Sequence, residues 1–291
     1  MRLYDGAISM TINRGVHQWD AEVALSEAAA RKTEPKRLTN PYDLAELDLT
    51  MFVSCYNESA HIVDTLEAVC AAAREAELSF EVIVIDDGSK DGSRELVRDY
   101  IARHPTENLI LRANRVNKGL AQNYVDAAFL GRGKYYRLMC GDNSHPKEAM
   151  LTVLKAIGSA DIIVPYYRSN QGKGLRRELI SKAYTILINI ISGNRIRYYN
   201  GLQVHLRHNV MRWHGNTRGF GFQAELLCLL LDLGFTYREI PVVIEERREG
   251  RSNALTFRNF VSVGHTISEI FIRRVSKWVY RKAPNTANAD M

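Results

Sequence analysis

The chain has 291 residues, of which 46% are hydrophobic and 25% are charged, and this composition excludes an intrinsically disordered protein. Its formal net charge of +6 favours anionic partners such as nucleotides, phospholipid headgroups or nucleic acid, without selecting among them. The cysteines lack metal-ligand spacing, no apolar stretch approaches the roughly 20 residues of a spanning helix, and no signal-peptide core begins the chain. We therefore expect a cytoplasmic protein whose membrane contact, if any, is peripheral.

The first 48 residues differ from the rest of the chain. An alanine- and glutamate-rich stretch at 21–30 has helical composition, and a polar, proline-punctuated linker follows it. We expect residues 1–48 to be an appendage with little core of its own. Residues 49–254 are expected to form the main domain, and residues 255–291 an amphipathic, basic helix and tail.

From residue 49 onward, short apolar runs alternate with helical segments. The apolar runs predict buried strands at residues 49–57, 80–89, 108–115, 135–143 and 160–167. Helices are predicted between these strands, beginning at Asn57, Ser89, Lys118 and Pro146. This alternation predicts an α/β fold, in which a mostly parallel sheet carries helices on both faces.

The second half is less regular. Helices are predicted over residues 179–193 and 224–234, and a strand over residues 236–246. The last segment, 256–282, has helical spacing of its apolar residues, basic residues in its last turns, and Trp278. The helices at 179–193 and 256–282 fit a bilayer surface, and packing in the core or in a homo-oligomer interface is the alternative.

Polar clusters follow three of the predicted strands, at residues 56–58, 86–87 and 141–143. Because ligands of open α/β sheets bind at the carboxyl ends of the strands, we expect the three clusters to form one site. Carboxylates at Asp86 and Asp87 suit the N–H groups of a base or the hydroxyls of a ribose. An Asp-capped turn after a strand is the alternative explanation for these two residues.

The same segments carry a resemblance. Tyr56-Asn57-Glu58, Asp86-Asp87-Gly88-Ser89 with Asp91-Gly92, and Asn117-Lys118-Gly119-Leu120-Ala121 resemble the family 2 glycosyltransferases of GT-A fold. The segments RRELISK, GFGFQAELL and IPVVIEERREGRSN resemble the dolichyl-phosphate mannose synthase branch, which transfers a sugar to a polyprenyl phosphate. The resemblance covers residues 48–255 and implies an inverting transferase that uses a GDP- or UDP-linked sugar.

The resemblance also implies roles for individual residues. The residues implied for the donor site are Tyr56, Asn57, Glu58, Asp86, Asp87, Gly88, Lys118, Gly119, Asp142 and Arg247. Those implied for the acceptor phosphate are Arg168, Arg177 and Ser181. Arg177 and Ser181 are four residues apart and share one helix face, and arginine forks suit phosphate oxygens, although a solvated surface arginine is the alternative.

Members of this family carry Asp-x-Asp after the fourth strand, where it holds Mg²⁺ or Mn²⁺ on the donor diphosphate. In this chain Cys140 replaces the first aspartate and Asp142 keeps the second. A thiolate is a poor ligand for Mg²⁺, but phosphates and waters supply most ligands of such an ion. Asp142, assisted by Asn143 or His145, is therefore expected to hold the metal, and capping of the next helix is its alternative role.

A phosphate acceptor is already largely anionic near pH 7, so no general base is expected. Asp142 and Arg247 would offset the charge of the leaving diphosphate.

One alternative function is that of a soluble family 2 enzyme that acts on a hydroxyl with Glu225 as its base. Another is a degenerate module that binds a nucleotide sugar without turnover, which Cys140 motivates. The segment YNESAH lacks the glycines of a nucleotidyltransferase phosphate loop, and no nucleic-acid-binding motif is recognisable.

Overall fold

The computed structural model describes residues 45–167, 175–213, 219, 221–243 and 257–281. These residues all belong to the compact unit that begins at Ala45. The appendage and helix predicted within residues 1–48 lie outside the described part, apart from the few residues that lead into the first strand, and the predicted domain boundaries therefore stay predictions.

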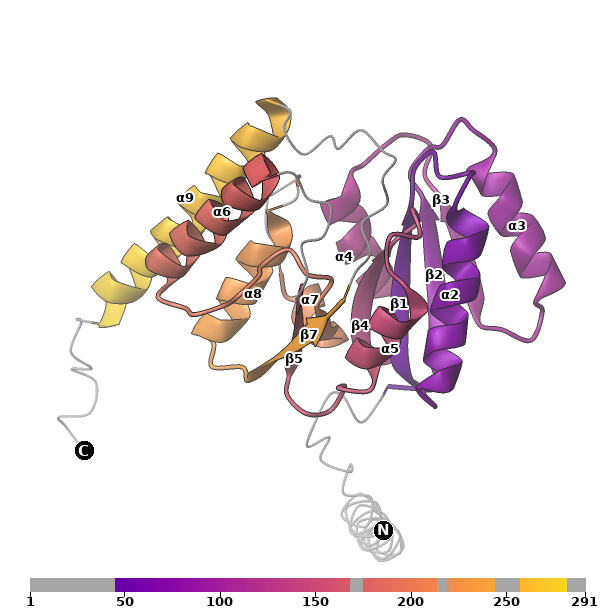
Figure 1. The fold of residues 1–291 in the computed structure, drawn as a ribbon, viewed down its shortest axis with the longest axis horizontal. Coiled ribbons are helices and arrows are strands. Elements are labelled where there is room, and N and C mark those ends of the chain that lie inside the picture. Colours follow the sequence, from indigo (N-terminus) through magenta and orange to yellow (C-terminus); the bar gives the residue numbers. More distant parts are fainter. Residues whose placement is uncertain (1–44, 168–174, 214–218, 220, 244–256, 282–291) are drawn as a thin grey trace, which may run out of the picture. The chain divides into compact units, whose positions relative to one another are not determined.

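A seven-stranded sheet with the order β3-β2-β1-β4-β6-β5-β7 forms the centre of this unit (Figure 1). The strands are β1 (Leu47–Cys55), β2 (Phe80–Asp86), β3 (Leu109–Ala113), β4 (Gly133–Cys140), β5 (Ile162–Tyr167), β6 (Val204–Leu206) and β7 (Tyr237–Val242). All strands run in one direction except β6, which is antiparallel to β4 and to β5. The predicted mostly parallel sheet is confirmed, and β6 is too short to show a pattern of its own.

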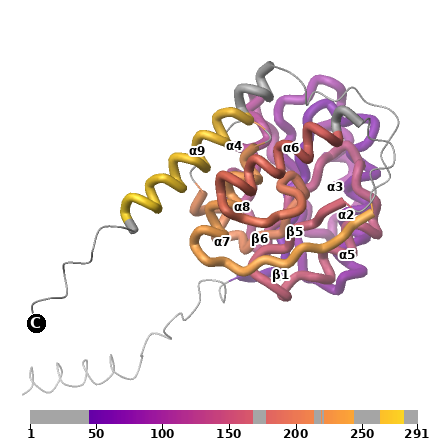
Figure 2. The backbone as a smooth tube through the Cα atoms, turned by 60° about the vertical axis from the view of Figure 1, so that its left-hand side comes forward, coloured from indigo at the N-terminus to yellow at the C-terminus, as the bar shows by residue number. Residues whose placement is uncertain are grey.

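Helices cover both faces of the sheet (Figure 1). They are α2 (Ile62–Glu75), α3 (Ser93–Arg103), α4 (Leu120–Leu130), α5 (Lys147–Leu154), α6 (Leu175–Ser192), α7 (Arg207–Met211), α8 (Phe222–Asp232) and α9 (Phe257–Arg281). Helix α2 packs against α3 and α5, and α4 packs against α7. The last helix, α9, contacts both α6 and α8, and lies beside α6 in both views (Figures 1 and 2).

Three helices begin later than the sequence pattern predicts. The helix after β1 begins at Ile62 instead of Asn57, and those after β2 and β3 begin at Ser93 and Leu120. Asn57 has a left-handed backbone, with φ of 57°, so it lies in a turn and does not cap a helix. The polar residues that precede each helix are consequently in loops at the carboxyl edge of the sheet.

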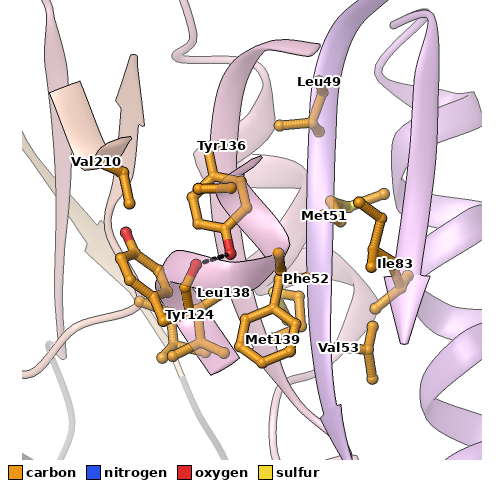
Figure 3. Packing of buried hydrophobic residues seen from close by; sticks show 14 of the residues in the cluster. Leu49, Met51, Phe52, Val53, Ile83, Tyr124, Tyr136, Leu138, Met139 and Val210 are labelled. Atoms are coloured by element: carbon orange, nitrogen blue, oxygen red, sulfur yellow. Dashed lines mark hydrogen bonds between the residues drawn. The ribbon is translucent and has the colours of Figure 1, made fainter. Parts of the chain in front are cut away.

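The core is packed around the central strands. Residues of β1 are apolar on both sides, because helices cover both faces of a mostly parallel sheet, and Leu49, Phe52 and Val53 are completely buried. Tyr136 of β4 crosses to α4, where its hydroxyl donates a 2.6 Å hydrogen bond to the carbonyl of Tyr124 (Figure 3). The rings of these two tyrosines also pack edge to face.

Tyr136→Phe is expected to lower the free energy of unfolding by about 1 kcal/mol, because the ring stays buried while one buried hydrogen bond is lost. Urea denaturation measures the change. Tyr237→Phe is the matched control, since Tyr237 lies on the edge strand β7 and is 40% exposed. Equal stability of the Tyr136→Phe variant and the wild type would show that the hydrogen bond contributes nothing.

Candidate active site

Strand register places the predicted site segments at one edge of the sheet. Cys55 at the end of β1 pairs with Asp86 at the end of β2, and Ser54 pairs with Cys140 at the end of β4. The three polar segments that follow these strands therefore leave the sheet side by side. This adjacency is the one that the sequence predicts from strand order.

Hydrogen bonds join the loop after β1 to the loop after β2. The backbone amide of Asn57 donates to the hydroxyl of Ser89, and the amide of Lys90 donates to the side-chain oxygen of Asn57, both over 2.9 Å. The amide of Ser59 donates to Oδ2 of Asp91, also over 2.9 Å. The loops after β1 and β2 thus form one hydrogen-bonded unit, and the Asn57 side chain is part of that unit.

Asp87 anchors the loop that follows β3. Its Oδ1 accepts hydrogen bonds from the backbone amide of Lys118 at 2.9 Å and from the side chain of Asn114 at 2.8 Å, and its Oδ2 accepts one from the amide of Gly119 at 2.9 Å. Burial raises the pKa of Asp87, but these hydrogen bonds outweigh it and lower the pKa overall. The structure thus brings Asp87, Lys118 and Gly119 together, and the Asp87 carboxylate is occupied by two backbone amides and the Asn114 side chain.

Asp86 is completely buried and is paired with Arg94 in the first turn of α3. Arg94 donates from Nε to Oδ2 of Asp86 at 2.8 Å, and its Nη2 lies 2.6 Å from the same oxygen. The amide of Ser89 donates to Oδ1 at 3.2 Å, which is the turn contact that the alternative explanation predicts. Sequence reasoning missed Arg94, although an arginine in a first helical turn opposes the helix dipole and so calls for an anionic partner.

The loop after β4 packs closely against the loop after β1. A Cβ at Gly141 would lie 2.5 Å from the carbonyl oxygen of Ser54, so only glycine permits this approach. Burial, and then the negative charges of Asp142 and Glu58, raise the pKa of the Cys140 thiol to about 12. Glu58, in the loop after β1, also lies close to this loop, because its Cγ would be 3.5 Å from a Cβ at Gly141.

The residues at this edge fit a divalent cation that a diphosphate shares, and they do not fit a metal held by protein ligands alone. Mg²⁺ bound with substrate phosphates commonly takes only one or two carboxylates, and Asp142 supplies one. Cys140 is a protonated thiol at neutral pH and a soft donor. Within the described ranges, no group of three or more His, Cys, Asp or Glu side chains could hold a metal.

Of the two neighbours expected to assist Asp142, Asn143 lies in a turn and His145 has other contacts. Asn143 has a left-handed backbone, and the ring nitrogens of His145 lie 3.0 Å from Ser144 Oγ and 3.4 Å from Tyr167 Oη. Asp142 does not cap α5, because the N-cap position of that helix is Pro146. It instead accepts a hydrogen bond from the amide of Ser144 at 3.1 Å.

A pocket of about 310 Å³ opens between the end of β5, one side of α6 and the segment before β6. The polar side chains that line it are Tyr166, Tyr167, Glu178, Ser181, Lys182, Thr185, Arg197 and Tyr198. Since Tyr167 also contacts His145, the pocket lies next to the loop that carries Asp142. The predicted residue Ser181 lines this pocket, whereas sequence reasoning missed Arg197 and the three tyrosines.

The other predicted residues are placed less completely. Arg168 and Arg247 lie outside the described residues. Arg177 is in the first turn of α6, where only its backbone is described.

Glu225 lies at the contact between α8 and α9. It is 2% exposed, and its Oε1 accepts hydrogen bonds from the indole of Trp213 at 3.1 Å and from Arg273 at 3.4 Å. A carboxylate held by an indole N–H and a guanidinium is well suited to fix the position of α9.

The family profile described as "Glycosyl transferase family 2" matches residues 50–218, more than half of the chain. The chain belongs to this family. It is 25% identical to the undecaprenyl-phosphate mannosyltransferase of Micrococcus luteus over 69% of this chain and 84% of that one. It is also 25% identical to the dolichyl-phosphate beta-glucosyltransferase ALG5C of Trichomonas vaginalis, over 84% and 77% of the two chains.

Solved structures agree on the fold. Mannosyl-3-phosphoglycerate synthase from Rubrobacter xylanophilus superposes with a TM-score of 0.59 at 15% identity, covering 87% of this chain and 83% of that one. Glucosyl-3-phosphoglycerate synthase from Mycobacterium tuberculosis, in complex with Mn²⁺, UDP-glucose and phosphoglyceric acid, superposes with 0.59 at 14% identity over 78% and 80%. The GT-A fold is thereby confirmed. The chain is a glycosyltransferase that uses a nucleotide sugar, and the non-catalytic alternative is set aside.

The contacts of Asp91 generate a pH-dependent prediction. Burial raises its pKa, but hydrogen bonds from the Ser93 hydroxyl and from the amides of Ser59 and Ser93 outweigh it and lower the pKa from 3.8 to about 2. The unfolded chain therefore binds the proton first, so the free energy of unfolding should fall as the pH drops through this window.

In Asp91→Asn the decline over this pH range should be shallower than in the wild type, because one depressed carboxylate has been removed. Denaturant titrations at successive pH values measure both slopes. At neutral pH, where this group does not titrate, the two slopes should agree. Identical declines in acid would show that Asp91 does not couple folding to proton binding.

Proposed function

We propose that this protein transfers the sugar of a nucleotide-sugar donor to a polyprenyl phosphate, inverting the anomeric carbon. The observation that carries the proposal is the pocket beside the Asp142 loop, whose lining includes the two cations Lys182 and Arg197 together with Glu178. Its position allows an acceptor phosphate to meet a donor that lies over the ends of β1, β2 and β4. Two relatives are named for transfer to undecaprenyl phosphate and dolichyl phosphate, and these names support a polyprenyl phosphate as the acceptor.

The pocket offers the chemistry that a phosphate monoester requires. Lys182 contributes an ammonium group from α6, and its nearest partner is Glu178 at 2.6 Å. Arg197 stacks over Tyr166 and donates to the hydroxyl of that tyrosine at 2.6 Å. We assign the acceptor phosphate to these two cations and Ser181, with Arg168 and Arg177 assigned to the same phosphate by resemblance.

An apolar surface continues from the pocket across α6 and α9. The large exposed apolar residues are Leu179, Ile180, Ile186, Leu187 and Ile190 on α6, and Phe271, Ile272, Val275, Trp278, Val279 and Tyr280 on α9. Ile186 belongs both to this surface and to the pocket lining. We propose that a polyprenyl chain leaves the pocket beside Ile186 and lies along these apolar residues.

Helix α9 is oriented with basic residues toward the protein. Arg273 contacts Glu225, and Lys277 and Arg274 lie 2.7 and 3.7 Å from Asp232 of α8. Ile270 of α9 is 3% exposed and packs in the core, as in an ordinary surface helix, so α9 presents apolar residues on its inner side as well as on its outer side. An outward apolar side with an exposed tryptophan fits the interfacial region of a bilayer, and we propose peripheral membrane contact there. Neither α9 nor any other described helix has the length and apolarity needed to cross a bilayer.

The reaction needs little proton chemistry. An acceptor phosphate has its second pKa near about 6, so an anionic oxygen is available at neutral pH to attack the anomeric carbon. The new bond forms as the bond to the nucleoside diphosphate breaks, and alignment of the two substrates supplies much of the rate. Asp142 is the residue that would hold a divalent cation, which offsets charge on the leaving diphosphate. Arg247 is assigned the same task by resemblance.

A hydroxyl acceptor would require a general base instead. The candidate, Glu225, is buried and is held by Trp213 and Arg273 at the joint between α8 and α9. This position supports the phosphate acceptor, for which no base is needed.

Lys182→Ala is expected to raise the KM for polyprenyl phosphate roughly tenfold and to leave donor affinity unchanged, because one charged contact to the acceptor is removed. A donor panel of GDP-mannose, UDP-glucose and UDP-N-acetylhexosamine first identifies the substrate, and steady-state transfer to a short polyprenyl phosphate then gives KM. Lys155→Ala, just beyond α5, is the matched lysine control. A wild-type KM in Lys182→Ala would remove the pocket from the acceptor site.

The membrane assignment has its own test. The double variant Ile272→Glu/Trp278→Glu is expected to lose flotation with vesicles of anionic phospholipid, because two charges replace apolar side chains on the exposed side of α9. Phe129→Glu on α4, which also replaces an exposed apolar residue, is expected to float like the wild type. Equal flotation of all three proteins would contradict bilayer contact through α9.

A further inference from the structure

Of the ion pair at the end of β2, Arg94 is the member that a ligand can reach. The carboxylate of Asp86 is completely buried, with one oxygen held by Ser89 and the other by Arg94. The Arg94 side chain is 29% exposed. A nucleotide at this strand end would therefore meet the guanidinium before it met the carboxylate.

The guanidinium lies between the ends of two strands. Besides its contacts with Asp86 on β2, its Nη2 approaches the carbonyl oxygen of Asn114, just after β3, at 3.5 Å. Asn114 begins the loop that Asp87 holds through Lys118 and Gly119. Arg94 thus borders the loops to which the donor nucleoside is assigned.

The contacts of Arg94 fix the plane of its guanidinium and leave some of its N–H groups available to a ligand. A guanidinium carries five N–H donors and no acceptor. The hydrogen bonds to Asp86 and Asn114 use Nε and Nη2, and among the described residues none is found from Nη1. Because the buried carboxylate orients the fork, the outward N–H groups are preorganised to meet an acceptor atom.

We propose that Arg94, positioned by Asp86, reads the base of the donor nucleotide and selects one with a carbonyl on its outer edge. Uracil O4 and guanine O6 accept a guanidinium hydrogen bond, whereas cytosine and adenine present an amino donor at the corresponding position. The inference rests on the donor site proposed above. In it Asp86 is a positioning residue, and the base contact belongs to Arg94.

The test measures base discrimination in the absence of any acceptor. Calorimetric titration of UDP, GDP, CDP and ADP into the full chain with Mg²⁺ is expected to show UDP or GDP binding at least about tenfold tighter than CDP and ADP. The double variant Asp86→Asn/Arg94→Gln removes both charges together, so no uncompensated buried charge is left to unfold the site. In this variant the four affinities are expected to converge to within about threefold.

Arg98→Ala provides the control, since Arg98 lies one turn further along α3 and is well exposed. It is expected to keep the wild-type ratios, and circular dichroism confirms that each variant is folded. A double variant that keeps the ratios, or that loses affinity for all four nucleotides equally, would overturn the inference and leave Arg94 with a structural role. A wild type that favours CDP or ADP, or binds no nucleotide, would overturn it as well.

The outcome is separable from the proposed acceptor. If Arg94 determines base discrimination but no sugar is transferred to polyprenyl phosphate, the result would support this inference and contradict only the proposed acceptor. Transfer to polyprenyl phosphate with discrimination that is independent of Arg94 would contradict only this inference.

Discussion

The backbone pairing of β1 with its two neighbours is the constraint on which the rest of the site depends. Because Cys55 pairs with Asp86 and Ser54 with Cys140, three loops leave the sheet within reach of one another. A shift of one residue would turn every side chain of β1 to the opposite face and separate those loops. Buried polar contacts resist such a shift, because the hydroxyl of Thr50 on β1 donates to Glu81 of β2 at 2.7 Å and accepts from the amide of Gly133 of β4 at 2.8 Å.

Most carboxylates of the DDGSKDG segment build the site instead of facing the substrate. Asp87 holds backbone amides of the loop after β3, and Asp91 holds the loop after β1. Asp86 positions Arg94. The motif is therefore mainly a scaffold that shapes three loops from a short sequence, and Asp142 and Arg94 are the groups to which ligand contacts are assigned.

The sequence predicts most of the strands because each is a short apolar run, and parallel strands necessarily bring their carboxyl ends to one edge, but it predicts neither β6 nor the order of the strands in the sheet. It predicts helix starts poorly. Asn57 reads as a cap, but hydrogen bonds to the neighbouring loop hold it in a left-handed turn. Such contacts join residues more than thirty positions apart, so no local pattern reveals them.

Two further features depend on tertiary contacts. The pocket proposed for the acceptor joins Ser181 of α6 to Arg197 beyond that helix, and the two residues meet only in the folded chain, where α6 and the end of β5 line the same cavity. The apolar stripe of α9 is visible in the sequence, but its direction is not. Ion pairs of Glu225 and Asp232 on α8 with Arg273 and Lys277, together with the buried Ile270, fix which side of α9 faces the protein.

A crystal structure with the donor nucleotide sugar and Mn²⁺ tests the central claim most directly. The account predicts that the diphosphate lies beside Asp142 and that the base lies against Arg94, between the loops that follow β1 and β3. A nucleotide bound elsewhere, with Asp142 and Arg94 both remote from it, would contradict the account.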